Sequence, residues 1–276
     1  MKVHEKCSVR AGIVLLGVAL CGSAAGQDTA AWKVHPSLHD TWNFQLGAFS
    51  ANVDTTARLD STTTGAGTSV SFEDDLGLAD RKTLGSFLAS VRLSQRWKIE
   101  AEYFSLSRGK TRAIDRTISW GDQTFTANTV VTSEFQSDTY RLSAGFAFLK
   151  DANSELGVAL GIHATDISAS LSASGVAAET GEALAPLPTI GIYGGYAFSP
   201  KWLLSGRVDY FSLSYENYDG SLVNAGAGIE YRLFRNFGIG VGYRHVEYDL
   251  SVTKSKFAGA INYKFGGPTL FAAASF

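Results

Sequence analysis

The segment WLLSGRVDYFS, from Trp202 to Ser212, alternates strictly between two kinds of side chain. One face is bulky and apolar, and the other carries Ser205, Arg207 and Asp209 in the middle of the segment. A period of two indicates a β-strand whose two faces meet different environments. The segments at 223–233 and 237–244 repeat this pattern, with Gly, Asn, Glu and Arg opposite the bulky face.

The size of the side chains indicates which face is which. A soluble sheet turns its large aliphatic side chains toward a shared core and its charges toward water. Charges that stand mid-strand between glycines instead fit a narrow polar lumen, with the bulky side chains turned to lipid. Trp97, Trp202, Tyr231 and Phe237 are expected near strand ends, where an interfacial aromatic girdle lies. We therefore predict an all-β protein, an up-and-down antiparallel transmembrane β-barrel, rather than a soluble β protein.

The connections between the strands alternate in length, as short periplasmic turns and longer external loops do. Four short turns separate five hairpins and predict about ten strands, with twelve or eight as alternatives. The longer connections are expected around 55–82, 108–128, 170–186, 215–220 and 250–255. The ten strands are expected at about 42–54, 83–94, 97–109, 133–149, 154–169, 187–198, 201–214, 221–234, 236–250 and from 255 toward the end.

Three segments leave the strand assignment open. Gly266-Gly267-Pro268 interrupts the last strand, because proline donates no hydrogen bond to a ladder. Either that strand is bent, or a further strand exists, for which 65–75 is a candidate. The strands on either side of 110–132 are expected to project as a hairpin that turns near 120–122, and the Ala-rich stretch 177–188 could form a short surface helix.

The N-terminus has the layout of a secretory signal peptide. Three basic residues precede a short apolar run at 11–20 and small residues at 23–26. We expect a signal peptide at 1–26, a periplasmic segment at 27–40 and the barrel at 41–276. Cys7 and Cys21 both lie in the signal, so the mature chain is expected to form no disulfide, and Leu20 argues against lipidation of Cys21. The expected location is the outer membrane of a Gram-negative bacterium.

The whole-chain charge argues against nucleic acid as a partner, because 24 Lys and Arg residues stand against 26 Asp and Glu residues. The expected partners are outer-membrane lipid and lipopolysaccharide, and the barrel-assembly machinery through the C-terminal Phe276.

The segment Phe72-Glu73-Asp74-Asp75-Leu76-Gly77-Leu78 resembles a pattern in a large, poorly characterised group of proteobacterial outer-membrane barrel proteins. That group shares an acidic Asp-Asp-Leu-Gly-Leu segment after the first strand. The stretches at 209–213 and 218–222, and Gly267-Pro268, fit the same group. The resemblance implies a fold and a location but no activity.

Twelve ionisable residues are predicted on the inner face of the barrel. In a ten-stranded barrel the interior is narrow, so opposite charges across it would pair and fill it. The alternative is a charge-lined narrow pore with a slight preference for anions. The residues are Arg92, Lys98, Glu100, Glu102, Arg141, His163, Arg207, Asp209, Glu230, Arg232, Arg244 and Lys264.

Catalysis and metal binding are both weakly indicated. His163 and Asp166 are three residues apart, so they point to opposite faces of a strand, and no Gly-x-Ser-x-Gly motif is present. Glu73, Asp74 and Asp75 form an acidic loop that could hold calcium, but we expect a solvated loop, with folding back on the end of the barrel as an option. We predict no enzyme activity, no cofactor and no metal site. The expected role is structural or that of a narrow pore; the alternatives are a surface-loop adhesion protein and, less favoured, a lipid-acting enzyme.

Overall fold

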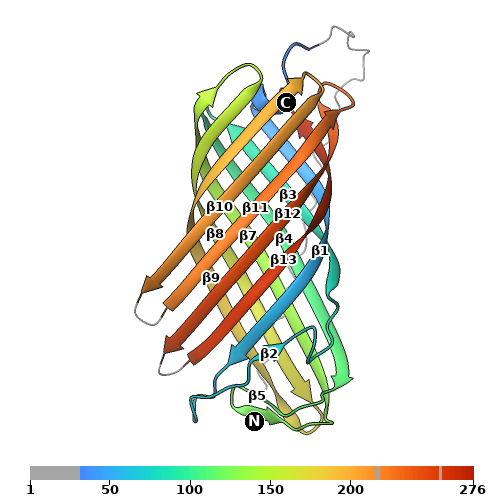
Figure 1. Cartoon of the computed structure of the whole chain (residues 1–276), viewed down its shortest axis with the longest axis vertical. Helices are drawn as coiled ribbons and strands as arrows, with labels where there is room; N and C mark the ends of the chain where they lie inside the picture. The colour runs from blue at the N-terminus through green and yellow to red at the C-terminus, as the bar shows by residue number, and fades with distance from the viewer. Residues whose placement is uncertain (1–31, 216–217, 255–256) are drawn as a thin grey trace, which may run out of the picture. The chain divides into compact units, whose positions relative to one another are not determined.

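The computed structural model describes residues 32–215, 218–254 and 257–276, and ten long strands in it close into an antiparallel barrel (Figure 1). Each strand pairs with the next one along the chain, and the last pairs with the first. This confirms the predicted fold and the count of ten. The strands are β1 (Trp42–Leu59), β3 (Arg81–Arg92), β4 (Trp97–Ala113), β7 (Val130–Lys150), β8 (Ser154–Ala173), β9 (Val176–Ser199), β10 (Trp202–Tyr215), β11 (Tyr218–Arg232), β12 (Phe237–Lys254) and β13 (Phe257–Ser275).

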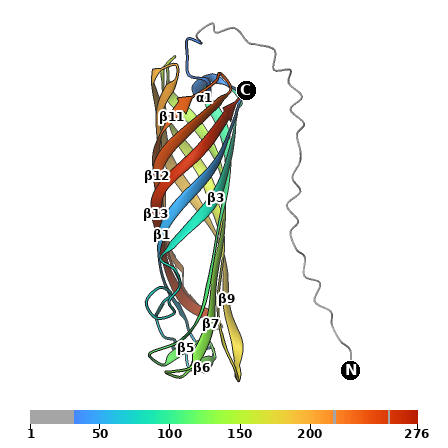
Figure 2. The same ribbon diagram turned by 90° about the vertical axis from the view of Figure 1, so that its right-hand side faces the viewer.

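Smaller elements lie at the two ends of the barrel (Figure 2). The four-residue helix α1 (Pro36–His39) lies at the end that holds the C-terminus and the short turns 93–96, 151–153, 200–201 and 233–236, which we call the turn end. The short strand β2 (Val70–Ser71) pairs with β1, and β5 (Ile118–Trp120) pairs with β6 (Gln123–Phe125), at the opposite loop end. In the described part of the chain, no helix has the length and apolar character needed to cross a membrane.

The strands run further toward the loop end than the sequence predicted. β9 is 24 residues long and takes in the stretch 177–188, so the expected surface helix there is wrong. The expected loop at 170–186 is wrong for the same reason, because β8 and β9 meet at a tight turn where Gly175 has φ of +79°. The sequence did not indicate these strand ends because their side chains are small or polar and show no clear alternation. Pairing with the neighbouring strand stabilises them.

The last strand, β13, is continuous through Gly266-Gly267-Pro268, as the bent-strand alternative required. Its ladder with β1 is interrupted there, between the pairs Phe49–Thr269 and Asn52–Gly266. A Cβ atom on Gly267 would overlap the carbonyl oxygen of Ser50, so only glycine allows the two backbones to come this close.

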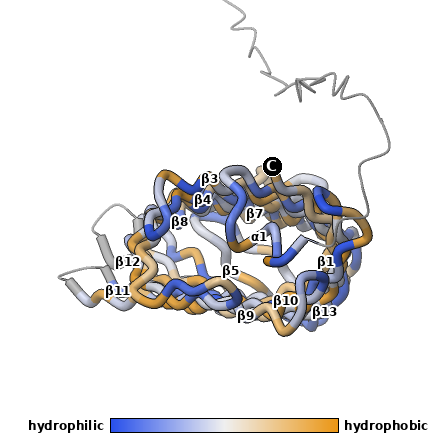
Figure 3. Tube along the Cα trace, turned by 90° about the horizontal axis from the view of Figure 1, so that it is seen from above, coloured by the Kyte–Doolittle hydropathy of each residue, from blue (hydrophilic) through white to orange (hydrophobic). Residues whose placement is uncertain are grey.

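A belt of exposed apolar side chains surrounds the barrel toward its turn end. Leu46 and Leu160, for example, are 67% and 68% exposed. Seen down the barrel, apolar and polar residues alternate along the wall (Figure 3). The belt covers positions 140–148 on β7 and 202–210 on β10, which at about 3.3 Å per residue and a tilt of about 40° gives a height of about 23 Å. Trp97, Trp202 and Phe237 are exposed at its turn-end margin, and the ring centroid of Tyr231 lies 4.7 Å from that of Trp202.

Beyond the belt the polarity of the wall reverses. On β7, Glu134 and Gln136 face outward and are exposed, whereas Val131 and Phe135 face inward and are buried. In this loop-end section the barrel has an apolar core and a mostly polar outside, with Val130, Leu184 and Leu213 as exposed apolar exceptions. The outward side chains of β7 are therefore polar in the loop-end section and apolar in the belt. The change occurs near Thr139 and Tyr140, and the inward side chains change in the opposite sense.

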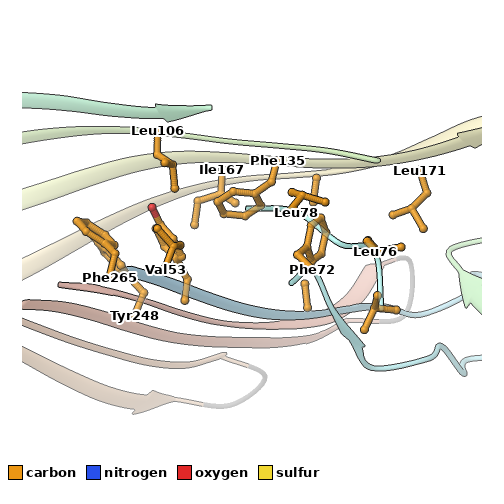
Figure 4. Close-up of a cluster of buried hydrophobic side chains, with 14 of the residues drawn as sticks. Val53, Phe72, Leu76, Leu78, Leu106, Phe135, Ile167, Leu171, Tyr248 and Phe265 are labelled. Atoms are coloured by element: carbon orange, nitrogen blue, oxygen red, sulfur yellow. The ribbon is translucent and has the colours of Figure 1, made fainter. Parts of the chain in front are cut away.

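Two seams divide the loop-end section into two walls that face each other across the core. β1 pairs with β3 only as far as Asn52–Arg81, and β9 pairs with β10 only as far as Ile190–Tyr210. Pro188 lies just beyond the second pair and has no N–H to extend the ladder. Figure 4 shows side chains from the segment 70–78 lying in the core between the walls.

Candidate functional site: the barrel interior

The structure brings eleven of the twelve predicted residues to the inner face. Lys264 is the exception, because it points outward and lies 3.6 Å from Glu247. It stands in the loop-end section, where Tyr263 and Phe265 occupy the apolar core and the polar residue between them faces solvent. The prediction for Lys264 is therefore wrong because it assumed one polarity along the whole strand.

Glu102 of β4 lies at the centre of the charged network in the lumen. Its carboxylate accepts hydrogen bonds from Arg141 at 2.9 Å and from Arg244 at 2.6 Å. Arg244 comes from β12, on the far side of the barrel in strand order, so this contact ties two distant strands together. Charge-assisted bonds of this kind are stronger than neutral ones, more so where water is excluded.

Glu100 and Glu155 are each shared by several cations. Glu100 pairs with Arg207 and with Lys98 at 3.2 Å, and its carboxylate lies 3.6 Å from Arg141. Glu155 joins Lys150 at 2.7 Å, Arg92 at 2.8 Å and Lys98 at 3.5 Å.

Sequence reasoning missed Lys150 and Glu155. Glu155 occupies the same strand parity as His163, which would have placed it on the inner face. Lys150 follows a register shift between Ala147 and Leu149, and that irregularity hides its direction from a simple count.

His163 lies beside Asp209, not Asp166. Its Nε2 is 3.6 Å from Oδ2 of Asp209, and both side chains are buried, whereas Asp166 is exposed on the outside of the same strand. The Asp209 carboxylate also accepts two hydrogen bonds from Nε of Arg207, at 2.8 and 2.9 Å. The geometry of Asp209 is thus set by the ion-pair network.

The acidic loop is a folded plug. In the segment 70–78, which we call the outer plug, Phe72 and Leu76 are 0% exposed. Glu73 pairs with Arg108 and accepts a hydrogen bond from the backbone N–H of Thr55 at 2.8 Å. The expectation of a solvated loop is wrong, because these buried side chains hold the loop inside the barrel.

Asp75 stabilises the outer plug through hydrogen bonds on its solvent-facing side. Arg116 donates two hydrogen bonds to it, at 2.6 and 2.9 Å, and these hold the pKa of the Asp75 carboxyl below its usual value. Asp75 also accepts from the N–H of Ser71, while Asp74 is exposed. Within the described ranges, no three His, Cys, Asp or Glu side chains are grouped so as to hold a metal ion.

The hairpin β5–β6 covers the outer plug. Trp120 packs edge-on against Phe72, with ring centroids 6.0 Å apart, and the chain turns at Gly121 and Asp122 as predicted. Asp122 accepts hydrogen bonds from Thr62 and Ser61, which lower its pKa.

At the turn end, residues 32–40, which we call the N-terminal segment, lie across the mouth of the barrel. Asp40 accepts hydrogen bonds from Arg235 at 2.6 and 2.7 Å. Ser37 donates to Glu230 at 3.2 Å, and Leu38 packs in a buried cluster with two residues of the barrel wall. The signal peptide expected at 1–26 lies outside the described residues.

His35 makes the docking of the N-terminal segment sensitive to pH. Burial, with Arg232 nearby, lowers the pKa of His35 from 6.5 to about 4; Asp40 and His39 also act on it, and Glu230 lies 3.9 Å away. Because the released segment would bind a proton more readily than the docked one, docking should be strongest above pH 6.5. It should weaken by up to about 3 kcal/mol as the pH falls from 6.5 to 4. Proteolysis of the segment measured against pH should show this loss, and His35→Gln should flatten the profile.

A cavity of about 280 Å³ lies between the two closures. One side is bordered by the charged network, and the other by small and neutral polar residues of β1, β3 and β13, among them Gln45, Ser86 and Thr269. Ser37 and Leu38 of the N-terminal segment also border it. The lumen therefore holds a polar cavity at the level of the apolar belt and an apolar core at the loop end.

No family model and no curated protein matches the chain. The outer membrane protease OmpT from Escherichia coli is similar in structure, with a TM-score of 0.55 and 14% identity over 90% of this chain and 100% of that one. The Pseudomonas putida toluene transporter TodX has a TM-score of 0.31 at 9% identity, over 86% of this chain and 90% of that one. Ail, the attachment invasion locus protein of Yersinia pestis, has a TM-score of 0.29 at 11% identity, over 84% and 99%. At these identities the likeness concerns the fold alone: this chain has the fold of an outer-membrane β-barrel protein.

Proposed function

We propose that the chain is an integral outer-membrane barrel of a Gram-negative bacterium with a closed lumen and a structural role. The height of the apolar belt and the aromatic side chains at its margin support this location, because they match a lipid-facing surface. The Asp-Asp-Leu-Gly-Leu segment further supports a place in the group of barrel proteins that carry it. We also propose that Phe276 at the end of β13 is read by the barrel-assembly machinery.

The observation that supports a closed lumen best is the outer plug. Phe72 and Leu76 fill the core between the two walls, and Trp120 covers Phe72 from outside. Water and ions do not pass through a close-packed apolar core. The buried His163–Asp209 pair lies behind this core, which also favours a protein without enzyme activity.

Electrical recordings test this proposal directly. The mature chain, refolded into planar bilayers and shown to be folded by its heat-dependent migration on gels, should give no conductance steps at moderate or high salt. Reproducible single-channel steps from the unaltered chain would contradict the closed lumen.

A surface-interaction role is the second candidate, and the loop-end section favours it. This section projects beyond the apolar belt with a mostly polar exterior, so it is placed to meet other molecules outside the membrane. Replacing the exposed tip at 62–66 by Gly and Ser should abolish adhesion of cells that carry the protein, while the barrel still folds. Unchanged adhesion would contradict the surface-interaction role and favour a purely structural one.

A further inference from the structure

The charged network in the lumen is not electrically balanced. It contains six cations and four carboxylates, and every carboxylate is already engaged by at least one cation. The remaining lumenal pairs, Glu230–Arg232 and Glu73–Arg108, each balance themselves. The cations are Arg92, Lys98, Arg141, Lys150, Arg207 and Arg244, and the carboxylates are Glu100, Glu102, Glu155 and Asp209.

Because these side chains are largely buried, the excess of two positive charges destabilises the folded barrel. No side chain of the ten is more than 16% exposed, and Arg141 is 2% exposed. Each cation has a carboxylate partner, but six cations share four carboxylates, so two positive charges are not neutralised within the network, and buried charge that is not neutralised is destabilising. Four of the six cations are arginines, whose guanidinium groups are not deprotonated in proteins. A bound anion would remove the excess.

The cavity next to the network has room and hydrogen-bond donors for such an anion. Its volume of about 280 Å³ exceeds what a single water molecule needs. Tyr193, Arg207 and Arg244 border it, and the two guanidinium groups carry N–H donors. Across the cavity, Ser86 and Thr269 add neutral donors. Several donors around a positive wall suit an oxyanion, which accepts several hydrogen bonds at once.

We propose that the lumen binds a small, free oxyanion of charge about −2, of the phosphate class, between the Lys98–Arg207–Arg244 side of the network and the hydroxyl side of the cavity. The barrel wall keeps lipid headgroups out, so the anion comes from the aqueous side at the turn end, where Ser37 and Leu38 border the cavity. The site needs no passage of ions through the barrel and so goes beyond the proposed function.

Inorganic phosphate is the probe. The mature chain in detergent should show a saturable rise of its unfolding midpoint with phosphate, measured against chloride at equal ionic strength, because a ligand of the folded state stabilises it. Isothermal titration should give the same dissociation constant. No saturable effect of phosphate beyond that of chloride would overturn the proposal.

Two variants that change the network charge in opposite directions distinguish an anion-binding site from a network that only stabilises the barrel. Lys98→Met lowers the positive excess and should weaken phosphate binding at least about tenfold, whereas Glu155→Gln raises the excess and should tighten binding. Lys264→Met, on the outer surface, is the matched control and should leave binding unchanged. If Lys98→Met does not fold, the comparison of phosphate binding by the Glu155→Gln variant and the unaltered chain tests the proposal. Equal phosphate binding by the unaltered chain and the Glu155→Gln variant would contradict the assignment.

Discussion

Replacing the outer plug by a flexible linker should turn a non-conducting barrel into a conducting one. In this variant, residues 61–79 give way to ten Gly and Ser residues, which reach about 33 Å and easily span from the end of β1 to the start of β3. Phe72 and Leu76 then no longer fill the loop-end core. The polar cavity behind them should open to the outside, and single-channel recordings should show steps that the unaltered chain lacks.

The matched control shortens the same loop but keeps the plug. Replacing only 62–66 removes the exposed tip and leaves the segment 70–78 in place, so this variant should stay non-conducting. A folded variant without the plug that still gives no steps would mean that the N-terminal segment blocks the turn end by itself. Removing residues 32–40 in addition would then be the next step.

Glu102→Leu should be the most damaging single substitution in the lumen. It leaves Arg141 and Arg244 without their shared carboxylate, and Arg141 has almost no access to water. Breaking a buried ion pair on one side costs about 3–5 kcal/mol, because the remaining charge is buried without compensation. Urea unfolding of the refolded barrel should show this drop in the free energy of unfolding.

Glu247→Leu is the control for Glu102→Leu. Glu247 pairs with Lys264 on the outer surface, at 3.6 Å and with both side chains well exposed. Exposed pairs contribute about 0–1 kcal/mol, so this substitution should be nearly neutral. Equal losses in the two variants would show that burial does not govern the strength of these ion pairs.

The alternation of side chains was enough to predict the class of fold, the number of strands and the face on which the charges lie. This holds because a strand repeats every two residues whatever it pairs with, and because the short turns mark the hairpins. Arg207, Asp209 and Glu230 were placed on the inner face by that period together with the bulk of the apolar side chains on the opposite face. The break in the β1–β13 ladder at Pro268 was also predictable, because proline donates no hydrogen bond to a ladder.

The partners of those charges were decided by the tertiary structure. Glu102 meets Arg244, and His163 meets Asp209, only because closure of the barrel brings together strands that are far apart in the sequence. Local sequence patterns also could not predict that the outer plug is buried or that Lys264 faces outward. Whether a strand face meets lipid, water or a packed core depends on its height in the barrel. That height follows from the pairing and tilt of all ten strands, whereas a period of two reports only that the two faces differ.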